Sequence, residues 1–285
     1  MCDSMPQKPA LISFDKLADV ANKLIDKISE ATGWVVSHDT PRRIAITNYI
    51  QEIQESDFDP LTKAALISNA KKCIKEFCNQ NDIVGIAIQS LKSNARAEEV
   101  NDDWLAQFMD KARLVSDSEF QILWGNILAE ECNQPGSIPK TLLHIMEHME
   151  KESAMAFMDI AALSVSTFDA GTIRNYPVIR FKGEAKQLIF GDIIIGLEQI
   201  VNLDSIGLIQ TNYGSYPDCY GAEFDTLPIV IDYFGKRHQF PEHITEIPIG
   251  NIVFTTAGEA LCKAVKPREI PNFLENYCIP FWNKV

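Results

Sequence analysis

The stretch from Ile229 to Phe240 reads IVIDYFGKRHQF and predicts a β-hairpin. Its first half is rich in β-branched and aromatic residues, as strands are, and Gly235-Lys236 supplies the turn before Arg237 to Phe240 returns. The segments before residue 166 carry helical periodicity instead. The hairpin therefore decides between an all-helical chain and a mixed one, and it favours the mixed one.

Short elements on both sides of this hairpin predict a small mixed module. Strands are expected at 178–181, 206–209 and 247–254, one helix at 192–203 and another at the start of Thr255-Thr256-Ala257-Gly258. The order of helix, Ile206-Gly207-Leu208-Ile209 strand, hairpin and final helix resembles a winged-helix domain. The resemblance implies that the hairpin is the wing and that a helix packs on a small antiparallel sheet.

The first 165 residues predict helices throughout. Apolar residues recur at helical spacing in 13–31, 41–56, 59–80, 81–92, 104–114, 139–150 and 152–165. Ser116 with Glu119 matches a capping box that opens a further helix, which Asn133-Gln134-Pro135-Gly136 ends. The expected fold class is α+β: an all-helical domain at 1–168 with a linker near 93–102, then a winged-helix-like module at 169–285 with a small antiparallel sheet and an aromatic tail.

The charge balance excludes a protein that coats nucleic acid or an anionic membrane by charge alone. The chain has 285 residues, 26 basic against 39 acidic, and a formal net charge of −13. Neutralising phosphates needs an excess of Lys and Arg. Residues 1–170 hold 16 basic and 26 acidic residues, and residues 171–285 hold 10 and 13. The C-terminal module is therefore close enough to neutral for a local basic contact.

The cysteines and the apolar runs indicate a cytoplasmic protein. The 7 cysteines are scattered without a C-x-x-C pair, which favours free thiols over disulfides or a zinc ribbon. Residues 1–11 lack the pattern of a signal peptide, and no apolar run approaches the length of about 20 residues that spans a bilayer. No membrane contact is expected.

A central block of the chain resembles a known family. The block consists of Trp104–Phe108, Val115–Glu119, Leu123–Glu131 and Pro135–Ser137, and the stretch Arg42–Ala45 fits the same pattern. It resembles an uncharacterised bacterial family catalogued as a domain of unknown function, which looks related to alpha-type abortive-infection proteins. The resemblance implies a helical scaffold and a place in anti-phage defence, and it supplies no catalytic residues.

One metal-binding pattern is present. His144, Glu147 and His148 match H-x-x-E-H, with which a helix can place two imidazoles on a metal and a carboxylate as base. The buried stripe of this helix runs through Leu142 and Met146, so both histidines are expected on the opposite, solvated face. No metal and no cofactor are expected.

Two carboxylate groups raise the alternative of a metal-dependent nuclease. Asp169 followed by Glu184-Ala185-Lys186 has the layout in which two acids hold Mg²⁺ and a lysine steadies the attacking water. Gly183 favours a solvated turn there rather than a strand end. The motifs of P-loops, Rossmann domains and α/β-hydrolases are absent from the sequence, and Cys132 and Cys219 lack a context that would activate a thiol.

A basic spot on the hairpin supports a second alternative, a DNA-binding regulator. Candidate phosphate contacts are Arg180, Lys182, Lys236, Arg237 and His238. The helix at 192–203, which would read DNA, has no Lys or Arg, although base readout usually needs such donors.

The leading hypothesis is a non-enzymatic protein-interaction component of a bacterial cell, in anti-phage defence, that works through its helical surface and wing. The expected partner is a protein, which includes a second copy of the chain, and nucleic acid is the alternative through the C-terminal module.

Overall fold

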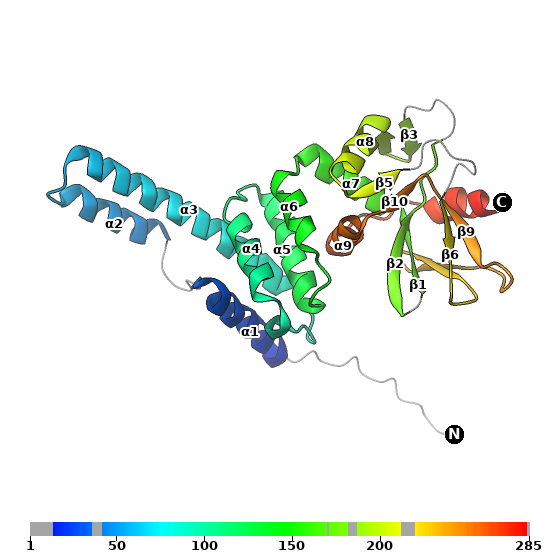
Figure 1. The fold of residues 1–285 in the computed structure, drawn as a ribbon, viewed down its shortest axis with the longest axis horizontal. Coiled ribbons are helices and arrows are strands. Elements are labelled where there is room, and N and C mark those ends of the chain that lie inside the picture. The colour runs from blue at the N-terminus through cyan, green and yellow to red at the C-terminus, as the bar shows by residue number, and fades with distance from the viewer. Residues whose placement is uncertain (1–13, 36–41, 170, 182–186, 212–219, 284–285) are drawn as a thin grey trace, which may run out of the picture. The chain divides into compact units, whose positions relative to one another are not determined.

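The computed structural model describes residues 14–35, 42–169, 171–181, 187–211 and 220–283 (Figure 1). The chain forms two compact units, Met1–Ser137 and Ile138–Val285. The expected α+β fold class is confirmed, since helices fill the first unit and small antiparallel sheets lie in the second. The units divide at Ser137, whereas the sequence placed the change at residue 168, because two helices that precede the first strand belong to the second unit.

The first unit is helical across its described residues. Its elements are α1 (Phe14–Thr32), α2 (Arg42–Glu55), α3 (Pro60–Ser90), the 3₁₀ turn η1 (Ala97–Glu99), α4 (Asp102–Ala112) and α5 (Ser118–Asn133). The segments predicted separately at 59–80 and 81–92 form the single helix α3. The predicted linker near 93–102 contains η1, with Ala97 and Val100 buried.

Aspartates cap two of these helices. Asp59 accepts hydrogen bonds from the N–H groups of Leu61 and Thr62 at 3.0 and 3.1 Å, which confirms the predicted start of α3. The predicted capping box at Ser116 is wrong by one residue. Asp117 is the N-cap of α5, and its side chain accepts hydrogen bonds from the N–H groups of Glu119 at 2.9 Å and Phe120 at 3.1 Å. Asp and Ser are equally good caps, so the sequence alone could not separate the neighbouring candidates.

The core of the first unit is aromatic. Phe108 lies 5.2 Å, centroid to centroid, from both Trp104 and Trp124, and all three side chains are buried. Helix α5 packs against α3, and Gly125 allows that approach, because a Cβ at this position would lie 2.5 Å from Cγ2 of Ile86. The block that suggested a family resemblance therefore contains the glycine at which α5 approaches α3 closely.

In its described residues, the second unit combines helices with four antiparallel sheets. Its helices are α6 (Lys140–His148), α7 (Lys151–Ala162), α8 (Leu197–Ser205), α9 (Thr256–Ala264), the π-helical η2 (Leu274–Cys278) and α10 (Ile279–Trp282). Its strands are β1 (Ser164–Asp169), β2 (Thr172–Pro177), β3 (Gln187–Phe190), β4 (Ile193–Gly196), β5 (Ile209–Thr211), β6 (Tyr220–Glu223), β7 (Val230–Tyr233), β8 (Lys236–Gln239), β9 (Glu246–Gly250) and β10 (Ile252–Phe254).

The predicted hairpin is present as β7 and β8. Lys236 pairs with Tyr233 in its register, and the turn places Phe234 and Gly235 at positive φ. Strand β7 also pairs with β1, which gives a four-stranded sheet in the order β2-β1-β7-β8. The hairpin is thus an integral edge of a sheet rather than a projecting pair of strands.

The two sequence elements that suggested a winged helix meet in the structure. Strand β5 pairs with β10, and Thr255 at the start of α9 donates its hydroxyl hydrogen bond to the carbonyl of Gly207 at 2.6 Å. A Cβ on Gly258 would lie 1.9 Å from the carbonyl oxygen of Leu208. Only glycine allows α9 to begin this close to the Gly207–Leu208 backbone.

Four predicted elements of the second unit differ from the structure. The strand expected at 206–209 begins at Ile209 as β5, and the single strand expected at 247–254 is divided into β9 and β10, which pair in different sheets. The helix expected at 192–203 begins at Leu197, because the run Ile193-Ile194-Ile195 is β-branched and pairs as β4 with β3. The strand expected at 178–181 is reduced to a single bridge between Ile179 and Gly250, and β2 ends before it at Pro177. Among the described residues, no helix combines the length and the apolar content that crossing a membrane requires.

Candidate functional site

The basic residues of the β7–β8 hairpin face carboxylates of their own unit. Nζ of Lys236 lies 2.9 Å from Oε1 of Glu269 and 3.7 Å from Oε1 of Glu275. The contact with Glu269 raises the pKa of Lys236 above its usual value. Nε of Arg237 lies 3.5 Å from Oδ2 of Asp232, its cross-strand partner. Both cations are thus already near an anion.

His238 and Arg180 contact the aromatic C-terminal segment. The His238 ring stacks on Trp282 at 5.8 Å, and burial lowers the pKa of His238. The Arg180 guanidinium lies 5.7 Å from the centroid of Phe281, a cation–π geometry. Lys182 lies outside the described residues. The four described candidates therefore all contact their own unit, three of them through its C-terminal segment.

The H-x-x-E-H residues lie on the surface of α6. His144, Glu147 and His148 are exposed, while Leu142 and Met146 are buried. Nε2 of His148 lies 3.9 Å from Oε2 of Glu147. Across the described ranges, no group of three or more His, Cys, Asp or Glu side chains is placed to hold a metal ion.

Asp169 is buried and has a structural environment. Its Oδ1 accepts hydrogen bonds from the N–H groups of Thr226 at 2.9 Å and Asp225 at 3.0 Å. The bond from Thr226 lowers the pKa of Asp169. Glu184 and Lys186, the other members of the proposed nuclease set, lie outside the described residues. Asp169 fixes the loop that precedes β7 to the end of β1.

Buried thiols have raised pKa values. Burial raises the pKa of Cys132 and Cys278, and it raises the pKa of Cys262 to about 12. A thiol with a raised pKa is a poor nucleophile at neutral pH. Cys219 lies outside the described residues.

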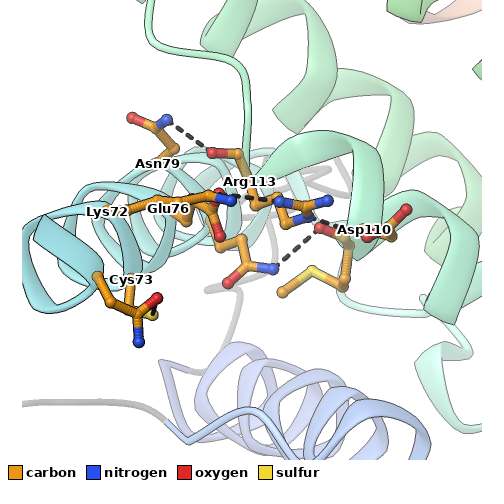
Figure 2. A network of polar contacts seen from close by, with 9 residues as sticks. Lys72, Cys73, Glu76, Asn79, Asp110 and Arg113 are labelled. Carbon is orange, nitrogen blue, oxygen red and sulfur yellow. Dashed lines mark hydrogen bonds and ion pairs between the residues drawn. The ribbon is translucent and has the colours of Figure 1, made fainter. Parts of the chain in front are cut away.

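A polar network joins α3 to the end of α4 in the first unit (Figure 2). Arg113 is drawn between two carboxylates there: its Nη1 lies 2.9 Å from Oε1 of Glu76 and its Nε lies 2.9 Å from Oδ1 of Asp110. The side chain of Asn79 donates to the carbonyl of Arg113 at 2.8 Å. The network therefore satisfies the last carbonyls of α4 and has a structural explanation.

Strands β3 and β4 and helix α8 each carry large apolar side chains that are exposed. We define the β3–α8 surface as Ile189, Ile194, Leu197 and Val201. Ile189 and Ile194 are cross-strand partners in the β3–β4 hairpin and are 62% and 53% exposed. Val201, one turn after Leu197 on α8, is 52% exposed. Sequence reasoning missed this surface, because the three consecutive isoleucines were assigned to a helix.

The ionisable residues of α8 are acidic. Helix α8 carries Glu198 and Asp204 and no Lys or Arg. Glu198 is exposed beside Leu197, whereas Asp204 accepts a hydrogen bond from the Thr211 hydroxyl. The β3–α8 surface is therefore apolar with an acidic flank.

Together these features define an α+β protein in which helix α8 and a β-hairpin present an apolar surface, while the basic hairpin is engaged within its own unit. The chain belongs to a family described as "Protein of unknown function (DUF2806)", which matches residues 69–278. The predicted membership of a family of unknown function is confirmed. The family's description carries no link to abortive infection or to winged-helix domains. Neither the curated proteins nor the solved structures gave a significant match.

Proposed function

We propose that this chain is a non-enzymatic protein-interaction component of a bacterial cell, with anti-phage defence as its setting. The observation that carries the proposal is the β3–α8 surface. Exposed apolar side chains on neighbouring elements are typical of surfaces that contact another macromolecule. The defence setting rests on the sequence resemblance to alpha-type abortive-infection proteins.

The character of the β3–α8 surface favours a protein over a nucleic acid. Phosphate binding requires cations, and Glu198 adds a negative charge beside Leu197 and Val201. A protein partner would bury the apolar side chains and offer apolar or basic groups to this flank. The expected occupant is therefore a polypeptide.

A phage-challenge experiment tests the proposal. Phage are expected to form fewer plaques on bacteria that express the wild-type chain than on bacteria with an empty vector. Val201→Asp is expected to abolish that protection. Ile173→Asp is a matched control, because Ile173 is 59% exposed on β2, away from α8 in sequence. Full protection by Val201→Asp, or no protection by the wild type, would contradict the proposal.

A biochemical test addresses the non-enzymatic part. The purified chain is incubated with Mg²⁺ and single-stranded DNA, double-stranded DNA, RNA or nucleoside triphosphates. No turnover above a mock purification is expected. Degradation that co-purifies with the chain and is lost in Asp169→Asn would favour the metal-dependent nuclease instead.

The alternative, a DNA-binding regulator, rests on the resemblance of the C-terminal module to a winged-helix domain. It is supported by the junction of β5, β10 and α9 and by Arg237, whose side chain is 77% exposed. It is weakened by the carboxylates beside Lys236 and by the acidic helix α8. A gel shift at low salt, with a salt dependence that decreases in Lys236→Ala/Arg237→Ala, would favour DNA binding over the leading proposal.

A further inference from the structure

The β7–β8 hairpin combines cations with aromatic rings. Residues Tyr233 to Phe240 read YFGKRHQF, so that Lys236 and Arg237 have aromatic side chains on both sides in sequence. Among the described strands, β8 alone carries two cations. Surfaces that bind single-stranded nucleic acid combine the same two groups, because cations attract the phosphates and flat rings stack on the bases. The hairpin therefore has the chemistry for such a ligand.

The chain's own C-terminal segment, residues 267–283, brings two carboxylates to Lys236. Glu269 and Glu275 place their Oε1 atoms 2.9 and 3.7 Å from Nζ of Lys236. The contact with Glu269 raises the pKa of Lys236, so the lysine stays charged at neutral pH. The three side chains are 40–45% exposed, and ion pairs this open to water stabilise little. An incoming phosphate can therefore exchange with either carboxylate.

The same segment places aromatic rings against His238 and Arg180. The Trp282 ring lies 5.8 Å from the His238 ring, centroid to centroid, and the two planes differ by 22°. The Phe281 ring lies 5.7 Å from the guanidinium carbon of Arg180. A base that stacks on a histidine or on a guanidinium makes the same kind of contact. The segment thus offers an anion to Lys236 and flat rings to its neighbours, as a nucleotide strand would.

We propose that the β7–β8 hairpin is a binding site for single-stranded nucleic acid, and that the C-terminal segment occupies this site in the free chain. This inference goes beyond the proposed function, because it concerns a surface other than the β3–α8 surface. A duplex is the poorer ligand, since its bases stay stacked on one another and α8 has no Lys or Arg to read a groove. The wild-type chain binds weakly, because the segment competes with the ligand.

Displacing the segment requires only its last part to move. Its first half is anchored, because the hydroxyl of Tyr233 accepts a hydrogen bond from the N–H of Ile270 at 2.9 Å and Phe273 is buried. The last described helix, α10, has four residues, and Nε1 of Trp282 donates to the carbonyl of Pro248 at 3.0 Å. Turning the two carboxylates away and releasing α10 therefore frees the hairpin, while the anchored half keeps the fold.

Fluorescence anisotropy of a labelled DNA strand of about 15 nucleotides tests the proposal on the full chain at about 50 mM salt. Glu269→Gln/Glu275→Gln is expected to bind about 10-fold more tightly than the wild type, because both competing anions are removed. Glu242→Gln/Glu246→Gln loses the same charge at two exposed positions of the same unit and is expected to bind like the wild type. Adding Lys236→Ala to the first variant is expected to cancel its gain.

Two further arms identify the ligand and the displacement. A duplex of the same sequence, and a peptide with the sequence of residues 267–283, are expected to bind Glu269→Gln/Glu275→Gln more weakly than the single strand does. Hydrogen exchange at the amides of residues 279–282 is expected to speed up when the strand binds. The inference would be overturned by no gain in this variant, an equal gain in the control variant, or a gain that survives Lys236→Ala. A duplex or peptide that binds as tightly, or unchanged exchange at residues 279–282, would overturn it as well.

Discussion

Gly125 on α5 and Gly85 on α3 are both helical glycines of the first unit, yet they should respond in opposite directions to alanine. A Cβ on Gly125 would lie 2.5 Å from Cγ2 and 2.7 Å from Cβ of Ile86, and 3.0 Å from the carbonyl oxygen of Ile83. A Cβ on Gly85 would meet nothing within 4 Å. Cβ and carbonyl atoms belong to the helix itself, so α3 has to move away to admit the methyl group at position 125.

The magnitudes follow from two opposing effects. Overpacking a tight core contact costs about 1–3 kcal/mol. Replacing glycine by alanine inside a helix gains about 1 kcal/mol. Because the clash involves backbone-near atoms, we expect the overpacking cost of Gly125→Ala in the upper part of that range, about 2–3 kcal/mol, and hence a net loss of about 1–2 kcal/mol, whereas Gly85→Ala keeps the gain.

Urea unfolding followed by tryptophan fluorescence measures the difference. Trp34, Trp104 and Trp124 lie in the first unit, so the signal reports mainly on it. With a urea dependence of about 1–3 kcal/mol per molar, the midpoint of Gly125→Ala should fall by about 0.3–2 M. An unchanged or higher midpoint for Gly125→Ala, or an equal fall for Gly85→Ala, would refute the close approach of α3 and α5.

Three further predictions concern the second unit and the thiols. Tyr233→Phe should lower the free energy of unfolding by about 2 kcal/mol in urea titrations. The buried hydroxyl of Tyr233 donates to the carbonyl of Ala162 and accepts from the N–H of Ile270, each at 2.9 Å, and phenylalanine loses both hydrogen bonds. A loss below about 0.5 kcal/mol would contradict this prediction. Burial raises the pKa of Glu259, so the stability that this group contributes is present below its unfolded pKa and is lost as the pH rises through the folded value. Glu259→Gln should therefore make the melting temperature depend less on pH above the ordinary carboxyl range, and an unchanged slope would count against this. In the native chain Cys73, which is exposed, should react with iodoacetamide before the buried thiols of Cys132 and Cys278, as peptide mass spectrometry can show; equal rates would refute their burial.

The helices and the β7–β8 hairpin were predictable because their signals are local. Apolar spacing marks α3, α4 and α5, and the glycine turn marks the hairpin. The strand at 193–196 was missed, because three isoleucines before a helix fit either state until β3 is known to pair with them. Asp117 displaced Ser116 as a cap for a similar reason, since adjacent caps differ little in propensity.

The candidate site was less predictable than the fold because its decisive contacts are distant in sequence. Lys236 was visible as a basic residue on a turn, but Glu269 and Glu275 come more than thirty positions later. Sequence periodicity identifies which residue is charged and leaves open which residue faces it. The exposure of Ile189 likewise follows from the pairing of β3 with β4 rather than from its own neighbours.

These distant contacts also bear on the proposed class of partner. A phosphate that binds Lys236 has to replace contacts with Glu269 and Glu275, so the gain is an exchange of one anion for another rather than a new interaction. Among the described residues, the four apolar side chains of the β3–α8 surface are 37–62% exposed to solvent. Burying them under a polypeptide releases that water without breaking an existing contact. This difference is the physical reason why we propose a protein rather than a nucleic acid as the partner.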